Sequence, residues 1–168
     1  SSYKLMDFYI LKEEVVKSLN LTLGVVEKRQ TLPILSNVLM EVDESSLRFT
    51  ATDLESEITT TSTISNFKSG GKITAPARKL NDLCRLLPDL TEIHFFLDGD
   101  NLNIETHSGK YNLSTLPSDD FPSFEIEDID SQINISSDNL SMLISKTSFA
   151  MGNQDWRHYL NGLFISID

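Results

Sequence analysis

Acidic side chains are the residues in this sequence whose spacing first suggests chemistry. Asp53, Glu55 and Glu57 alternate along the segment TDLESEI. On a β-strand this alternation would place all three carboxylates on one face, where they could bind a metal ion or form an acid pair. The simpler interpretation is the solvated face of an antiparallel strand, because no histidine lies near them in the sequence.

Histidine and cysteine do not offer a better catalytic or metal site. His94, His107 and His158 are scattered, and none has the spacing of a metal-ligand pair. Cys84 is the single cysteine and stands in an apolar pattern, which fits a reducing cytoplasm rather than a disulfide framework. Because no acid, base and nucleophile cluster together, we expect a protein that is not an enzyme and that has no metal or other cofactor.

The basic residues suggest contact with the phosphates of nucleic acid instead. Arg78 and Arg85 are seven residues apart in APARKLNDLCRLLP, which follows a proline suited to a first helical turn. The apolar residues of this segment recur at the spacing of one helical face: Leu80, Leu83, Cys84 and Leu87. The two arginines then lie opposite that face. From spacing alone, ordinary solvated arginines are the simpler interpretation, and a phosphate-contacting surface is the alternative.

The elements that would position these residues follow from the apolar periodicity. A first helix is predicted over 7–19, with Phe8, Leu11, Val15 and Leu19 on one side. Strands are predicted at SNVLMEVD, SLRFTATD, SEITTTSTI and KITAP, and after the second helix at EIHFFLDG, NLNIETHSG and YNLSTLP. Turns are predicted at 43–45, 52–53, 69–71, 98–99 and 108–109. The order of helix, strands, helix and strands predicts an α+β fold.

The sequence also matches itself at an offset of 125 positions. The matching pairs are Ile10 with Ile135, Val15 with Leu140, Leu19 with Ile144, Leu35 with Leu160, Met40 with Ile165 and Val42 with Ile167. A helix followed by a strand at one common offset predicts a structural repeat. Arg29 falls on Gln154 at this offset. These two long donors either face water or contact a polymer whose backbone also repeats.

The repeat predicts two domains of unequal completeness. Residues 1–125 form one complete unit, and 126–168 contain a linker with the first helix and strand of a second unit. The linker TLPSDDFPSFEIEDID has two prolines, dense acid and no basic residue, as domain boundaries often do. We therefore expect the chain to be a fragment, a truncated gene product or a chain whose tail was lost. If it folds alone, the residues from about Ile133 should be frayed or paired with another molecule.

The charge distribution is uneven. The net charge is −11, and no Lys or Arg occurs between Tyr111 and Ser145, whereas basic pairs occur at 28–29 and 78–79. Opposite faces can therefore differ in sign, so the acidic total does not exclude a nucleic-acid ligand. No apolar run is long enough for a membrane span, and the N-terminus does not resemble a signal peptide, so we expect a cytoplasmic protein.

Five segments, in order, resemble the bacterial DNA sliding clamp family, the β subunit of DNA polymerase III. They are RQTLPILSNVLMEV, TATDLESEI, APARKLNDLCRLLP, YNLSTLPSDDFP and QDWRHYLNGLFISI. The resemblance implies a DNA-clamp fold, in which each unit packs two helices on antiparallel sheets. Three units make a subunit, and two subunits form a homodimeric ring with the helices lining the hole.

The resemblance also implies a function. Such a ring is a non-catalytic processivity factor of DNA replication, which encircles duplex DNA and tethers the polymerase. It belongs to an assembly with DNA-directed DNA polymerase activity. Its implied partners are double-stranded DNA without sequence preference, the catalytic subunit of polymerase III, the clamp loader and other clamp-binding peptides.

The resemblance also implies site residues, which are assigned by matching positions of this sequence to those of the family. Arg29 and Gln154 match residues that contact the duplex backbone, and Arg78 and Arg85 match the inward helix, with Arg78 the stronger candidate. Phosphate contacts of this kind read no sequence, as sliding requires. Leu160 and Arg157 match positions beside the hydrophobic pocket that receives partner peptides.

Two departures from the family pattern lie near that pocket. His158 replaces a common Tyr, and Trp156 replaces a small or β-branched residue. The sequence ends before the family's TDGHR-like segment, most of the pocket and the third unit. A second hypothesis is an acidic β-rich protein-interaction module without a DNA role, for which the three arginines are incidental.

Overall fold

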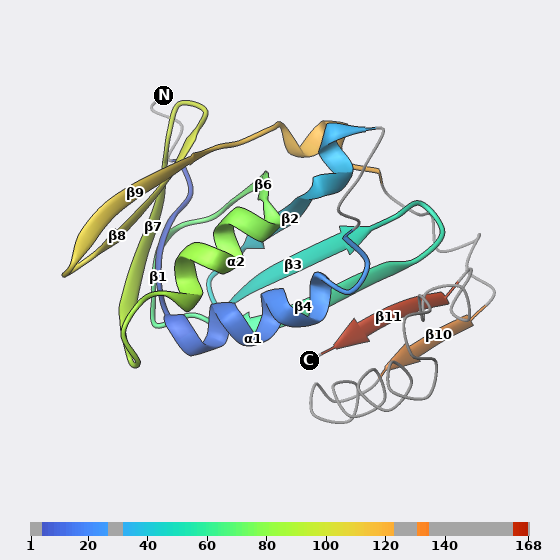
Figure 1. Ribbon diagram of the computed structural model, residues 1–168, viewed down its shortest axis with the longest axis horizontal. Coiled ribbons are helices and arrows are strands. Elements are labelled where there is room, and N and C mark those ends of the chain that lie inside the picture. The colour runs from blue at the N-terminus through green and yellow to red at the C-terminus, as the bar shows by residue number, and fades with distance from the viewer. Residues whose placement is uncertain (1–4, 27–31, 123–130, 135–162, 168) are drawn as a thin grey trace.

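The computed structural model describes residues 5–26, 32–122, 131–134 and 163–167 (Figure 1). The two helices are α1 (Lys12–Thr22) and α2 (Ala77–Arg85), and short 3-10 helices occur at Pro33–Ser36 and Ser118–Asp120. The strands are β1 (Asp7–Leu11), β2 (Asn37–Val42), β3 (Ser46–Thr52), β4 (Glu57–Thr63), β5 (Asn66–Ser69), β6 (Gly71–Pro76), β7 (Glu92–Asp98), β8 (Asn101–Thr106), β9 (Gly109–Ser114), β10 (Ser131–Asn134) and β11 (Leu163–Ile167).

These strands form two sheets. The five-stranded sheet has the order β5-β1-β7-β8-β9, and the six-stranded sheet has the order β10-β11-β4-β3-β2-β6. Every pair among β1 to β9 is antiparallel, whereas β11 runs parallel to both β4 and β10. The structure therefore confirms the predicted α+β class with antiparallel sheets.

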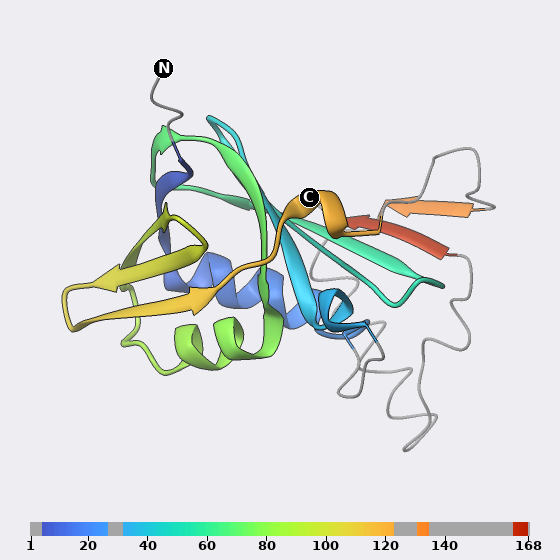
Figure 2. The same ribbon diagram turned by 90° about the horizontal axis from the view of Figure 1, so that it is seen from above.

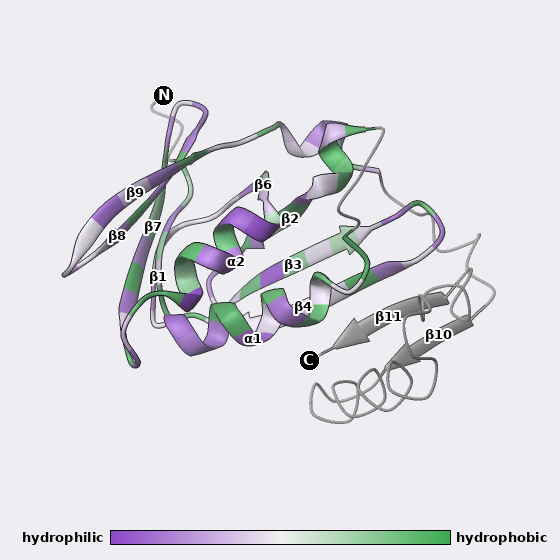
Figure 3. Cartoon of the chain, viewed as in Figure 1, coloured by the Kyte–Doolittle hydropathy of each residue, from purple (hydrophilic) through white to green (hydrophobic). Residues whose placement is uncertain are grey.

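Both helices lie together on one side of the six-stranded sheet (Figure 2). Hydrophobic and hydrophilic residues alternate along each helix (Figure 3), as burial of one face requires. The largest fully buried side chains of the common core include Phe8, Ile10, Leu19, Met40, Phe49, Ile58, Leu80 and Phe95. One contiguous core thus fixes the helices relative to the strands.

Hydroxyl groups join α1 to β4. The Ser18 and Ser62 hydroxyls are hydrogen-bonded to each other in the buried interface. Ser62 Oγ also donates a hydrogen bond of 3.1 Å to the Glu14 carbonyl oxygen. The β4 sequence EITTTST places hydroxyls on the face that meets the helix. Buried hydroxyls need such partners, so this seam orients α1 more specifically than apolar packing alone.

The second predicted helix is confirmed. α2 begins directly after Pro76 and ends at Arg85. Leu80 and Cys84 are fully buried and Leu87 nearly so, while Leu83 is partly buried against the core. The apolar stripe read from the sequence is thus the face that packs inward.

The first predicted helix is wrong over its initial residues. Residues 7–11 form β1, and the helix begins only at Lys12. Phe8 and Ile10 are both buried, with the period of two that a strand requires, and Phe8 stacks on Phe95 with ring centroids 5.3 Å apart. The helical spacing of Phe8, Leu11 and Val15 coincides with this alternation, and pairing with both β5 and β7 decides for the strand.

The later strands fall near the repeat positions. Subtracting the offset of 125 from 131–134 and 163–167 gives 6–9 and 38–42, which overlap β1 and β2. β11 pairs with β4 of the same chain, so the expectation of a frayed or intermolecularly paired segment is wrong for its backbone. The predicted helix between these strands lies outside the described residues, and the domain boundary at 125–126 stays a prediction.

Candidate nucleic-acid interface

The polar face of α2 lines a cavity beside the end of α1. Arg78, Asn81, Asp82 and Arg85 approach it from α2 at helical spacing, and it has a volume of about 410 Å³. Asn20, Leu23 and Gly24 complete the lining. The structure therefore brings the two predicted α2 arginines to one surface, next to the turn that follows α1.

The Arg78 side chain is not free. Its Nη2 donates a hydrogen bond of 2.6 Å to the carbonyl oxygen of Val26, four residues beyond the end of α1. Its Nε is buried and has no hydrogen-bond partner in the part of the chain that the structure describes. Arg78 is therefore partly enclosed between the helices, whereas the sequence predicted a position opposite the buried stripe.

Arg85 differs in its surroundings. It is exposed in the last turn of α2 and makes no hydrogen bond or ion pair with any described residue. A cation near a helix C-terminus interacts favourably with the helix dipole. Arg85 is thus exposed on the side of α2 away from the buried stripe, as its spacing predicted; its contact with phosphate stays a prediction.

Asn81 is a site residue that sequence reasoning missed. Asn81 is 3% exposed, and its Oδ1, which lies beside Arg78 on the same cavity, is buried with no hydrogen-bond partner among residues 5–26, 32–122, 131–134 and 163–167. The sequence did contain an indication of this residue. Asn81 lies between Leu80 and Leu83 in the interior of the predicted helix, where asparagine is unfavourable. A polar group in this position indicates a polar cavity rather than a closed apolar contact.

The opposite end of the helix pair is fixed by residues of α1. Lys12 Nζ donates to the Leu87 carbonyl oxygen at 2.5 Å and lies 3.5 Å from Asp89 Oδ1. A Glu13 carboxylate oxygen accepts the Leu90 N–H at 2.7 Å. Lys12 and Arg78 are thus reciprocal: each is at the start of one helix and donates to a carbonyl just past the end of the other.

The remaining predicted site residues lie outside the described residues. These are Arg29, Gln154, Arg157 and Leu160, together with the two departures, Trp156 and His158. Their roles in DNA and peptide binding stay predictions.

The alternating acids do not share a strand face. Asp53 and Glu55 lie in the turn between β3 and β4, where Asp53 Oδ1 accepts the N–H groups of Glu55 at 3.0 Å and Ser56 at 2.7 Å. Asp43 plays the same part in the preceding turn. Only Glu57 belongs to the strand, so the grouping of three carboxylates is wrong, because turn formation takes precedence over alternation.

Glu57 is nevertheless unusual, because it is a nearly buried carboxyl at the first position of β4. Its side chain is 8% exposed. Burial raises its pKa from 4.5 to about 7, and the charge of Glu41 adds to this. The group is therefore partly protonated near neutral pH.

His94 and Cys84 take part in packing and hydrogen bonding within the fold. His94 stacks on Tyr9 with centroids 4.2 Å apart, and its Nε2 lies 2.7 Å from Asp7 Oδ1. Cys84 is buried, which raises the pKa of its thiol to about 12. Among the described residues, no three His, Cys, Asp or Glu side chains are grouped to hold a metal ion.

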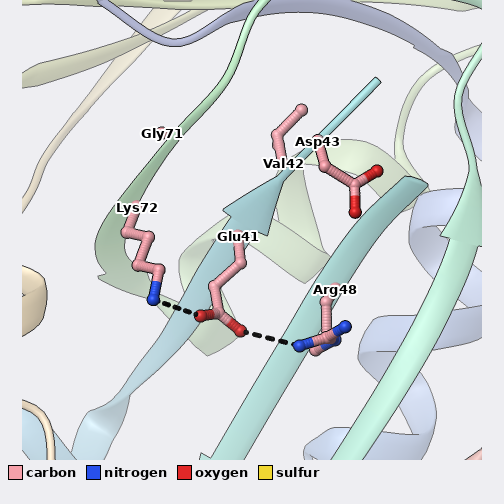
Figure 4. Close-up of a pocket in the computed structure, with 6 residues that line it drawn as sticks. All are labelled: Glu41, Val42, Asp43, Arg48, Gly71 and Lys72. Atoms are coloured by element: carbon pink, nitrogen blue, oxygen red, sulfur yellow. Dashed lines mark ion pairs between the residues drawn. The ribbon is translucent and has the colours of Figure 1, made fainter. Parts of the chain in front are cut away.

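A second depression, of about 300 Å³, lies between β2, β3 and β6 (Figure 4). The Glu41 carboxylate stands between two cations there, 3.1 Å from Lys72 Nζ and 3.6 Å from Arg48 Nη1 (Figure 4). Both cations are thus already paired with an acid. Of these two depressions, the cavity beside α2 is the one that offers a guanidinium, that of Arg85, with no ion-pair partner among the described residues.

No helix among the described residues is both long and apolar enough to cross a membrane.

Comparison with known proteins adds the family. The family model for the N-terminal domain of the DNA polymerase III beta subunit matches residues 6–126. Beta sliding clamps of Vibrio cholerae and Pseudomonas aeruginosa are 41% and 42% identical over 163 residues, which is 97% of this chain and 44% of each relative. The chain thus spans less than half the length of these relatives.

Comparison with solved structures identifies the same family. A Pseudomonas aeruginosa sliding clamp bound to griselimycin is 42% identical, with a TM-score of 0.76 over 92% of this chain and 42% of that one. A Caulobacter crescentus beta sliding clamp is 36% identical, with a TM-score of 0.74 over 94% of this chain and 42% of that one. The interaction module without a DNA role is not favoured, and this chain belongs to the DNA polymerase III beta subunit family of DNA sliding clamps.

Proposed function

We propose that this chain is part of a DNA sliding clamp, the processivity factor of a replicative DNA polymerase. The clamp encircles duplex DNA without reading its sequence and tethers the polymerase to it. The observation that most supports this function is the polar face of α2, where Arg85 is exposed and has no partner among the described residues. A guanidinium there attracts phosphates, and it cannot distinguish bases.

The mechanism needs no chemical step from this chain. Electrostatic attraction to the phosphates releases counterions and keeps the duplex beside the helices. The 25 acidic residues, which outnumber the 14 basic ones, would repel DNA elsewhere on the surface. The proposed DNA-contacting residues are Arg29, Gln154, Arg78 and Arg85.

The remaining assignments follow from family membership and belong to the same proposal. The proposed boundary separates a first clamp domain at 1–125 from the start of a second at 126–168. Leu160 and Arg157 border the pocket for peptides of the polymerase and clamp loader. The proposed assembly is a cytoplasmic homodimeric ring without a metal or other cofactor.

Salt dependence of DNA binding tests this function. We would measure the affinity of the protein, as its cell makes it, for a short fluorescent duplex between about 50 and 200 mM salt. Arg85→Ala and Arg29→Ala should each reduce the slope of log affinity against log salt by about 0.9, the value for one lost phosphate contact.

Arg48→Ala is the matched control. It removes the same charge from an exposed side chain of β3 that is paired with Glu41, and the slope should stay as in the wild type. Equal slopes for all four proteins would contradict the proposed function and favour an interaction module that does not bind DNA.

A further inference from the structure

The face of the five-stranded sheet that points away from the core carries an aromatic row, formed by Tyr9, His94 and Phe96. We propose that this face is a docking surface for an arginine-bearing segment of a partner protein. The guanidinium stacks on the aromatic row while nearby carboxylates bind its charge. Both helices lie on the other, core-facing side of this sheet (Figure 1), so the inference goes beyond the proposed function and does not depend on it.

Strand alternation separates the two faces of the sheet. The core-facing residues of β1 and β7 include Phe8 and Phe95, which are fully buried. The residues next to them in each strand point to the opposite face. There Tyr9 lies directly opposite His94 in the β1–β7 register, and Phe96 follows His94 by two positions. All three rings are only half-buried, whereas the outward face of an antiparallel sheet usually carries polar side chains.

The aromatic row is ordered by its own contacts. The Tyr9 and His94 rings are stacked, with centroids 4.2 Å apart and planes 3° apart, and the His94 and Phe96 centroids are 4.8 Å apart. His94 Nε2 lies 2.7 Å from Asp7 Oδ1, which fixes the orientation of the middle ring. Tyr9 and Phe96 each contact His94, and no other described ring stacks on either of them. A surface arranged in advance in this way loses little entropy when it binds a partner.

The charge of this face is mainly negative. Its charged side chains on β1, β7, β8 and β9 are Asp7, Glu92, Asp98, Glu105 and Lys110. Lys110 Nζ lies 3.5 Å from a Glu105 carboxylate oxygen, and β5, at the edge of the sheet, adds Lys68.

The carboxylates of this face are not all neutralised by neighbours. Glu92 and Asp98 have no ion-pair partner in the part of the chain that the structure describes. The Asp7 side chain is 38% exposed and uses Oδ1 for His94, so its second oxygen can accept a hydrogen bond from outside. A face of this sign attracts a cation and repels a phosphate.

The combination of rings and carboxylates favours arginine over other cations. The faces of aromatic rings attract positive charge. A guanidinium is planar, stacks on such rings and is more weakly hydrated than the ammonium group of lysine. Its remaining N–H groups can donate to a carboxylate at the same time. The occupant that matches this face is therefore a peptide segment that carries arginine.

Calorimetric titration with short peptides tests the surface. The protein, as its cell makes it, would be titrated with acetyl-Gly-Arg-Gly-Arg-Gly-amide up to about 10 mM. Matched peptides would carry lysine or citrulline in place of both arginines. The arginine peptide should bind saturably, and the lysine peptide should bind more weakly because its charged group does not stack. The citrulline peptide has nearly the same shape without the charge and should not bind.

Variants of the protein separate the rings from the carboxylates. Tyr9→Leu and Phe96→Leu should each weaken binding of the arginine peptide about two- to fivefold, the effect of one lost cation–π contact. Tyr9→Phe keeps the ring and should bind as the wild type does. Glu92→Gln should weaken binding at low salt and less at high salt, since salt screens exposed charges. Glu44→Gln removes an exposed carboxylate in the turn between β2 and β3 and is the matched control, which should have no effect.

Three results would overturn the docking surface. The first is no binding of the arginine peptide, and the second is equal binding of the arginine and lysine peptides by the wild type and both leucine variants, which indicates general attraction to an acidic protein. The third is a lower melting temperature of the leucine variants with unchanged peptide binding, which would mean that the rings only stabilise strand pairing. The salt slope of duplex binding tests the proposed function separately, so either hypothesis can fail while the other stands.

Discussion

Glu57→Gln should stabilise the protein in alkaline solution and have little effect in acid. The carboxyl of Glu57 is nearly buried, and its pKa in the folded state is about 7 instead of 4.5. The folded state therefore holds its proton more tightly than the unfolded state. The stabilising contribution of the protonated group is complete below pH 4.5 and is lost as the pH rises through about 7.

The size of the effect follows from the shift. A difference of about 2.5 pKa units corresponds to about 3 kcal/mol of folding free energy at 1.36 kcal/mol per unit. Glutamine has nearly the same shape and no charge, so Glu57→Gln avoids this cost at high pH. For a chain of this size, 1 kcal/mol changes the melting temperature by about 2–4 °C, so the variant should melt about 6–12 °C higher.

Thermal unfolding followed by circular dichroism at about pH 9 and about pH 4 would measure this difference. At the lower pH the carboxyl is protonated in both states, and the two melting temperatures should converge. Glu44→Gln, at an exposed position in the turn between β2 and β3, is the control and should show no such pH dependence. A Glu57→Gln variant that melts below the wild type at about pH 9 would refute the reasoning.

Three further predictions concern the core and one strained loop. Leu90 has a φ of 62°, which is strained for a residue with a side chain. Leu90→Gly keeps the N–H that Glu13 accepts and should raise the free energy of unfolding, measured by urea titration, by about 1 kcal/mol. A less stable variant would contradict the presence of backbone strain at this position. Cys84 should not react with a thiol reagent at about pH 8 until urea unfolds the protein, and rapid modification of the folded protein would show that the thiol is accessible. Phe95→Ala removes a fully buried ring that stacks on Phe8 and should lower the free energy of unfolding by about 3–5 kcal/mol, whereas a loss below about 1 kcal/mol would mean that the site repacks.

Local patterns in the sequence predicted α2 well, because Pro76, the apolar stripe and the length of the segment all indicate the same helix. The same kind of pattern failed at residues 7–11, where helical spacing and alternation coincide and only the pairing of β1 with β5 and β7 decides. Asp53 and Glu55 were misplaced because a side-chain bond within the turn ends the strand alternation. In each case the outcome depended on contacts that a local window does not contain.

The candidate site was predictable only in part. The helical spacing of Arg78 and Arg85 indicated a shared face, and the cavity confirms that they meet on one surface. The bond from Arg78 to Val26 spans 52 positions, and the bond from Glu13 to Leu90 spans 77. No periodicity identifies such partners, so the separation of the two arginines into a tied and an exposed residue required the three-dimensional structure.

The reciprocal bonds of Lys12 and Arg78 have a mechanical consequence. Each joins the start of one helix to the chain just past the end of the other, at opposite ends of an antiparallel pair. Sliding one helix along the other by a single residue, about 1.5 Å, would lengthen both hydrogen bonds at once. Rotation of either helix about its axis would break at least one of them. The two bonds therefore oppose sliding of one helix along the other, so that a force on one end of the pair should move α1 and α2 together as one unit.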